Sequence, residues 1–364
     1  MAFRKDGKLK LDSLSFIATH VVLFFHLKSI DNMKKIFNLI FSFVLLAGFS
    51  ACNKQSLPPA PVPTVNYKGL TFISSGKSTV RLAKVGNPDE ITLEYSTDES
   101  QWNPYTIGKK ISLADGKFLL FRAGEQKNLT FSKGSDSYYH FEISGPVTAQ
   151  GNIMSLLDRD FSTPLSTNAF FALFEGCKSL RSAPELPATT MGQGCYFRMF
   201  AGCTGLKSAP ELPAKVLAYN CYGMMFKGCS ALTDVPDLPA TEMEVYCYNN
   251  MFANCTSLKV APELPATRLD MGCYHCMFEG CTSLTSAPEL PATELVSNCY
   301  EFMYKDCRNL RYVIGLFTTE PSKKTTEDWL SGVAASGTFI KSKKATWDVT
   351  GVHGIPEGWK IETW

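Results

Sequence analysis

The chain has 364 residues, of which 45% are hydrophobic and 12% aromatic, so it can build a sizeable core and is not a disordered tail. Charged residues make up 19% and the formal net charge is +2, which excludes a bulk electrostatic attraction to nucleic acid or to an acidic membrane surface. A chain of this length is expected to form two modules or a repeat array.

The first part of the chain has the features of an export signal. A basic start (Met33-Lys34-Lys35) precedes an apolar run over 36–46 and small residues just before Cys52. This arrangement resembles a bacterial lipoprotein signal over 33–51, which implies that the Cys52 sulfur receives a lipid and becomes the mature N-terminus. The alternative is an ordinary signal peptide with an incidental cysteine. Residues 1–32 contain a second apolar run that is too short to span a bilayer, so we interpret them as a misassigned upstream start.

Two different segments follow the leader. Residues 52–64 contain four prolines, which favour an extended spacer between the lipid and the folded part. Residues 65–151 contain short alternating apolar runs separated by Gly, Asn, Asp and Ser, a pattern that predicts a small antiparallel β-sandwich. Trp102 and Tyr105 could contact carbohydrate, but a core position is the favoured interpretation for an aromatic residue in a sandwich.

A repeat of 26 residues dominates the rest of the chain. Two series of cysteines share this period, and the surrounding unit recurs five times in register: Cys177, Cys203, Cys229, Cys255, Cys281 and Cys307 in one series, and Cys195, Cys221, Cys247, Cys273 and Cys299 in the other. A period between about 20 and 30 residues is typical of a stacked solenoid. We assign residues 152–316 to the solenoid and residues 317–364 to a C-terminal capping segment.

Each unit divides into two predicted halves. Over 190–202 the apolar residues are spaced as on one face of an α-helix. The position that would close this helix is restricted to residues that tolerate positive φ, which predicts a left-handed C-cap at Gly176, Gly202, Gly228, Asn254, Gly280 and Asp306. The following segment must be extended, and its two prolines keep the strand short. The predicted fold is therefore an α/β solenoid with a short strand and a helix in each rung, preceded by an all-β sandwich.

The sequence Leu-x-x-Ala-Pro-Glu-Leu-Pro over 180–187, together with Met277-Phe-x-Gly-Cys-Thr-Ser-Leu284, resembles the BspA-like leucine-rich repeats of surface lipoproteins of gut-type bacteria. The resemblance covers about residues 170–316. It implies a leucine-rich-repeat-like solenoid that serves adhesion or recognition at the cell surface, and it names no ligand.

The repeat cysteines are interpreted as buried thiols that pack as small hydrophobes, in preference to disulfides, because neighbouring rungs do not bring the sulfurs to bridging geometry. Cys273 and Cys276 form one Cys-x-x-Cys pair. A redox or metal site there is the weaker alternative, because a mid-helix position lacks the environment that lowers a thiol pKa.

No catalytic constellation, metal cluster or cofactor motif is recognisable, so we expect a protein that is not an enzyme and has no cofactor. Binding is expected on the strand face of the solenoid, where variable basic residues accompany an acidic column. The candidate binding residues are Glu185, Glu211, Asp237, Glu263, Glu289, Arg181, Lys207 and Lys259. The acidic column is either screened by solvent and neighbouring bases or neutralised by cations or a basic partner.

The sequence favours a lipid-anchored recognition or adhesion protein of the outer membrane that binds a protein or glycan partner as a monomer. It would be held to the membrane by the lipid alone and would face the cell surface, with the periplasmic face as the alternative. A structural envelope protein without a soluble ligand is the second hypothesis. A carbohydrate-active accessory protein is the third, and it would need a catalytic acid that the sequence does not reveal.

Overall fold

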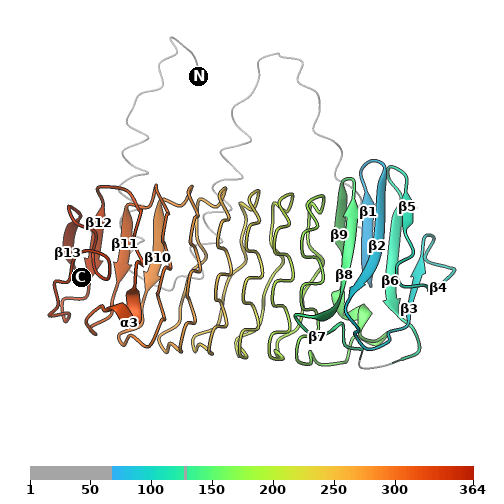
Figure 1. Ribbon diagram of the computed structural model, residues 1–364, viewed down its shortest axis with the longest axis horizontal. Helices are drawn as coiled ribbons and strands as arrows, with labels where there is room; N and C mark the ends of the chain where they lie inside the picture. Colours follow the sequence, from blue (N-terminus) through green and yellow to red (C-terminus); the bar gives the residue numbers. More distant parts are fainter. Residues whose placement is uncertain (1–67, 127–128) are drawn as a thin grey trace, which may run out of the picture. The chain divides into compact units, whose positions relative to one another are not determined.

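The computed structural model describes residues 68–126 and 129–364, so Cys52 and the leader lie outside the described residues. Residues Val65–Trp364 form one compact unit. Its described part is an array of antiparallel sheets, stacked coils and a final parallel sheet (Figure 1). No helix in residues 68–126 and 129–364 has both the length and the apolar character to cross a membrane.

Two antiparallel sheets open the described chain. One has the strand order β4-β3-β6-β1-β9 and the other β5-β2-β8-β7. Their bounds are β1 (Leu70–Ser74), β2 (Ser78–Val85), β3 (Leu93–Ser96), β4 (Asn103–Tyr105), β5 (Ile111–Leu113), β6 (Phe118–Ala123), β7 (Ser132–Gly134), β8 (Ser137–Ser144) and β9 (Val147–Gln150). Alternating side chains face inward, and the rings of Phe72 and Phe141 meet edge to face with centroids 4.9 Å apart.

The two aromatic residues singled out in this region have different environments. Tyr105 is buried, and its hydroxyl accepts a hydrogen bond from the Leu82 N–H at 2.9 Å and donates one to the Lys109 carbonyl at 2.6 Å. Trp102 is only half-buried, and the guanidinium of Arg122 lies 3.7 Å from its ring centroid. The prediction of a core position is therefore wrong for Trp102, which stacks against a charged side chain at the surface.

Both sheets continue directly into the coils. On one side, parallel bridges join Val147 of β9 to Leu180 of the first coil and Asn152, just after β9, to Glu185. On the other side, the Phe141 N–H donates a hydrogen bond to the Leu173 carbonyl at 2.7 Å. A single cluster of buried hydrophobic residues extends from Leu70 to Trp359. The antiparallel sheets therefore close the first end of the stack and share its core.

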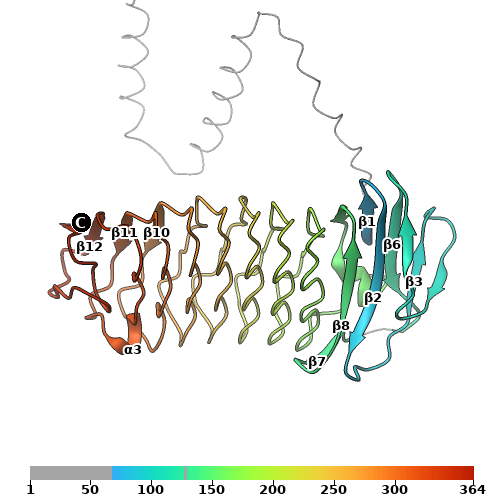
Figure 2. The ribbon, with the colours of Figure 1, turned by 45° about the horizontal axis from the view of Figure 1, so that its top comes forward.

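The helix predicted in each rung is absent, and this corrects the α/β fold class. Helix in the described part is limited to α3 (Lys323–Thr326) and the 3-10 helix η1 (Ile153–Leu156). Residues 192–203 instead form consecutive hydrogen-bonded turns. Odd residues such as Phe197 donate their N–H to the carbonyl three residues earlier, and even residues such as Tyr196 donate to the next coil, here to the Cys221 carbonyl at 3.0 Å. Figure 2 accordingly shows no helix in these coils.

The physical reason is the backbone conformation at every fourth residue. Gly194, Arg198 and Gly202 have φ of 58°, 58° and 71°, whereas an α-helix needs φ near −63° at every position. The buried pairs Cys195-Tyr196 and Met199-Phe200 follow the same four-residue period. Over one short segment this period is hard to distinguish from the 3.6-residue period of a helix.

The positive φ predicted at the column of Gly176, Gly202, Gly228, Asn254, Gly280 and Asp306 is confirmed, with values from 59° to 75°. These residues do not cap a helix, since each ends a run of turns. The column is also not unique, because two further columns have positive φ and include residues such as Asn220, Tyr246 and Phe302.

A four-stranded parallel sheet ends the array, in the order β10-β11-β12-β13. Its bounds are β10 (Ser286–Leu290), β11 (Tyr312–Gly315), β12 (Thr338–Lys341) and β13 (Lys360–Thr363). Phe339 of β12 packs against Phe317 and Trp329, and all three are completely buried. The ring of Trp329 stacks on Tyr300 with centroids 6.2 Å apart.

Two columns of aromatic rings run through the middle of the coils. Tyrosines stack with centroid distances of 5.8–6.0 Å: Tyr196, Tyr222, Tyr248, Tyr274 and Tyr300. Phenylalanines stack in parallel at 5.3–5.7 Å: Phe174, Phe200, Phe226, Phe252 and Phe278. Because all ten rings are buried, these columns form the core and are not available to a ligand.

Candidate functional site

The strand predicted in each rung is also not regular, because residues 180–265 form only isolated β-bridges and the first regular strand on this side of the coils is β10. The extended backbone on this side nevertheless presents alternating side chains to the core and to solvent. In the first coil Leu180, Pro184 and Leu186 are buried, whereas Arg181 and Glu185 are exposed. The pattern recurs in the following coils, so each coil adds a basic residue or threonine, an alanine or valine, an acidic residue and a proline to one surface. We call this surface the outer strand face and define it by residues 181–187 and their counterparts in the next four coils.

The predicted acidic column lies on this face. Glu185, Glu211, Asp237 and Glu263 are exposed, and Glu289 in β10 is half-buried. Among the ion pairs and side-chain hydrogen bonds formed within residues 68–126 and 129–364, none involves these five carboxylates. Within the described residues, therefore, the negative charges of the acidic column are not neutralised by direct ion pairs with lysine or arginine.

The predicted basic residues Arg181, Lys207 and Lys259 are also exposed on the outer strand face, and threonine occupies the same position in two other coils. Each base precedes the acid of its own coil by four residues, a separation of roughly 13 Å for an extended backbone. This exceeds the Debye length of about 8 Å at physiological ionic strength, so the two rows act as separate stripes of opposite charge. The row between them consists of the small apolar residues Ala183, Ala209, Val235 and Ala261, followed by the buried Ala287.

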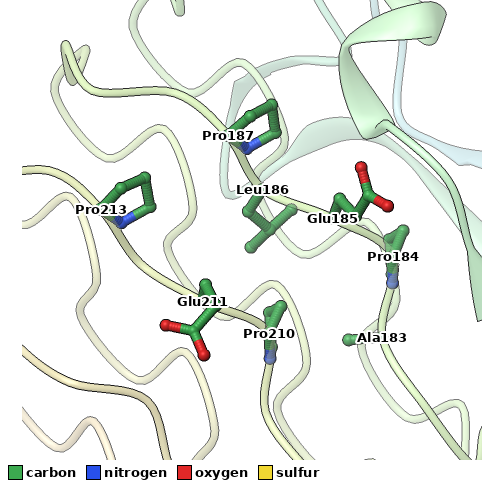
Figure 3. Close-up of a pocket in the computed structure, with 8 residues that line it drawn as sticks. All are labelled: Ala183, Pro184, Glu185, Leu186, Pro187, Pro210, Glu211 and Pro213. Atoms are coloured by element: carbon green, nitrogen blue, oxygen red, sulfur yellow. The ribbon is translucent and has the colours of Figure 1, made fainter.

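A shallow groove of about 320 Å³ lies between the first two coils at the acidic stripe. Figure 3 shows Glu185 and Glu211 on successive coils, with prolines and the apolar Leu186 between and around them. Proline rings lack a backbone donor and are rigid, so this part of the face offers apolar contact and carboxylates on a fixed backbone. Such a surface suits an extended ligand that runs across the coils.

The opposite, turn side of the coils holds a polar cluster that sequence reasoning missed. His275 Nδ1 lies 3.2 Å from Asn249 Oδ1, and His275 Nε2 lies 3.5 Å from Glu301 Oε2. Cys276 Sγ is 3.8 Å from the same Nε2. Asn249, His275 and Glu301 occupy one position in three successive units of 26 residues. Aligning the repeats in columns would have indicated that these three side chains are neighbours.

The environment of Cys276 in this cluster does not favour the thiolate form that a nucleophilic cysteine needs. Burial and the neighbouring Glu279 raise the pKa of the Cys276 thiol to about 12, and burial lowers the pKa of His275. The thiol is therefore protonated at neutral pH. Cys273, its partner in the sequence motif, is completely buried among core residues. Within the described chain no group of three or more His, Cys, Asp or Glu residues could hold a metal ion.

The twelve cysteines of the described chain are buried free thiols. In the first series each Sγ donates to a phenylalanine carbonyl, from Cys177 to Phe141 in β8 and from the later cysteines to the preceding coil, as from Cys203 to Phe174 and from Cys229 to Phe200 at 3.0 and 3.1 Å. Burial raises the pKa of the Cys229 thiol to about 12. These cysteines therefore act as packed side chains with a weak donor.

The fold and this face define a β-rich repeat protein with two charged stripes on one side. Comparisons with protein families, with curated proteins and with solved structures each found no match.

Proposed function

We propose that the protein is a lipid-anchored recognition or adhesion protein of the bacterial outer membrane, which binds a protein or glycan partner through the outer strand face. The observation that carries the proposal is the row of carboxylates from Glu185 to Glu263, which are exposed and form no ion pair or side-chain hydrogen bond with any residue that the structure describes. Placing like charges on successive coils costs free energy through repulsion, and the fold gains nothing visible in return.

Two further arguments support recognition over catalysis. The exposed face is regular and rigid, as in solenoids that bind extended partners. The repeat sequence resembles that of BspA-like surface proteins, and Cys52 follows a lipoprotein-type signal. The lipid would tether the folded part and leave the outer strand face free to meet a partner.

The test is binding of the purified folded chain to a glycan array and to isolated cell-surface proteins, compared with a variant in which Glu211, Asp237 and Glu263 are replaced by Gln. We expect the triple variant to lose at least tenfold in affinity with an unchanged melting temperature. The matched control replaces three exposed carboxylates away from this face, Glu90, Glu244 and Glu320, and should bind like the wild type.

Equal binding by both triple variants would contradict the assignment of the outer strand face. If the wild type binds neither glycan nor protein, the structural envelope hypothesis replaces recognition. Turnover of a glycan in the same assay would instead support the carbohydrate-active alternative.

A further inference from the structure

The parallel sheet ends at β13, which has a neighbour on one side only within the part of the chain that the structure describes. Its partner is β12, paired in parallel from Thr338–Lys360 to Lys341–Thr363. Figure 1 places β13 as the outermost strand at this end of the array. An edge strand presents a row of unpaired backbone groups and is a template for pairing with another strand.

The backbone groups that point outward can be identified. Lys360 and Trp364 donate their N–H groups inward, to the Gly337 and Lys341 carbonyls, each at 2.9 Å. Because N–H and C=O groups alternate in direction along a strand, Ile361 and Thr363 direct theirs away from β12. The side chain of Ile361 is 38% exposed and that of Trp364 is 62% exposed, so apolar surface accompanies the open edge.

The charges of β13 are self-complementary in one arrangement. Lys360 and Glu362 flank Ile361 and already lie 2.6 Å apart within the strand. If two copies of β13 pair antiparallel about Ile361, that residue becomes a hydrogen-bonded pair with itself and uses its outward groups. Each Lys360 then lies opposite Glu362 of the other copy, where side chains approach most closely. No other centre within the strand places both charges opposite their complements.

Head-to-tail extension of this sheet is disfavoured at the β4 edge of the first antiparallel sheet, which the coils connect to β10 through β9. The first antiparallel sheet ends at β4, whose middle residue is Pro104. Proline lacks the N–H that a neighbouring strand would need, so this edge cannot continue the ladder. An isologous contact between two β13 edges closes on itself and leaves the blocked β4 edges at the outside.

We propose that two copies of this chain associate through antiparallel pairing of their β13 strands, centred on Ile361. The contact joins the two sheets into one continuous sheet and covers Ile361. This replaces the expectation of a monomer and goes beyond the proposed function, because it involves the end of the array and not the outer strand face.

The test is sedimentation analysis of a chain that begins at Val65, the start of the compact unit that contains the whole described core. Its omission of Cys52 removes any association through lipid. We expect a concentration-dependent monomer–dimer equilibrium for the wild type. Lys360→Glu alone and Glu362→Lys alone should each weaken dimerisation at least tenfold, and the double swap should restore it because the charges are again complementary.

A backbone variant supplies the second arm. Ile361→Pro removes an outward N–H that the folded chain does not use, so we expect a monomer whose melting temperature stays within a few degrees of the wild type. Three outcomes would overturn the proposal: a wild type that is monomeric at all concentrations, a double swap as weak as the single variants, or open-ended filaments in place of a closed dimer.

Discussion

The thiol of Cys229 donates a hydrogen bond to the carbonyl oxygen of Phe200 in the preceding coil, across 3.1 Å. The same carbonyl already accepts the backbone N–H of Cys203 at 3.0 Å. The first cysteine series therefore adds a donor to a buried carbonyl at each step of the stack. Of the second series, Cys195 and Cys247 contact methionine sulfur instead, at 3.6 and 3.7 Å.

This difference predicts unequal responses to serine. Cys229→Ser keeps a donor that faces a carbonyl, whereas Cys221→Ser buries a hydroxyl for which the described part of the chain shows no accepting carbonyl. We expect Cys221→Ser to lower the free energy of unfolding by about 1–2 kcal/mol more than Cys229→Ser. Chemical denaturation of the two variants measures this, and equal losses would show that the Cys229 hydrogen bond contributes nothing measurable.

The positive-φ column makes a second prediction, at Gly228. A Cβ at this position would come no closer than 3.8 Å to the neighbouring Gly202, so side-chain space is not limiting. The backbone has φ of 75°, which costs a β-branched residue about 1–2 kcal/mol. Gly228→Val should therefore lower the melting temperature.

Gly228→Asn is the matched control for that substitution, because Asn254 fills the same column with φ of 61°. We expect the asparagine variant to melt close to the wild type. A valine variant as stable as the asparagine variant would mean that the left-handed conformation is not retained at this position.

As the pH is lowered, protonation of buried histidines should reduce the free energy of unfolding at pH values above those at which the carboxylates titrate. Burial lowers the pKa of His275 and of His140 below the ordinary value of 6.5. The unfolded chain therefore binds more protons than the folded chain as the pH falls below about 6.5, and stability decreases in that direction. Thermal melts between pH 7.5 and pH 5 should show this slope, in a range above the ordinary pKa values of 4.5 and 3.8 for Glu142 and Asp158.

His275→Gln should flatten part of that slope, because glutamine does not titrate and can still donate to Asn249. Replacing the exposed Lys259 by Gln provides a control that should leave the slope unchanged. A slope identical in the wild type and the His275 variant would exclude His275 as a source of the acid sensitivity.

Processing is predicted from the sequence alone, since Cys52 lies outside the described residues. The mature protein should begin at Cys52, carry a lipid and partition into detergent, whereas Cys52→Ala should leave an unlipidated precursor. Intact-mass analysis of the cell-envelope fraction decides this. Detection of residues 1–32 in the mature protein would contradict both the assigned start and the lipid anchor.

The sequence predicts some features of the coils better than others, for physical reasons. The 26-residue register indicates which residues recur from coil to coil, and the glycine column correctly indicates positive φ at Gly202 and Gly228. The helix prediction failed because the Cys195 to Phe200 spacing fits both a four-residue turn and a helical period. Arg198 and Met224 also have φ above 50°, and the sequence could not indicate this because arginine and methionine rarely adopt positive φ.

In the candidate site, too, some features could be predicted from the sequence and others could not. Exposure of Glu211 and Arg181 follows from strand alternation and was predictable. The contacts of His275 with Asn249 and Glu301 join different coils, and single-residue patterns do not reveal them. Trp102 was misplaced because an aromatic residue between strands can stack on a guanidinium as readily as enter a core.

The equal register of the coils also makes the length of the molecule adjustable in whole steps. Each unit of 26 residues stacks its Tyr and Phe rings only on the units before and after it. Loss or duplication of one whole unit would restore the same ring contacts across the new junction, because the core Cys, Tyr, Met, Phe and Leu columns recur in every unit. Such an event would shorten or lengthen the outer strand face by one coil and one carboxylate, and the ring contacts between the remaining units would be unchanged.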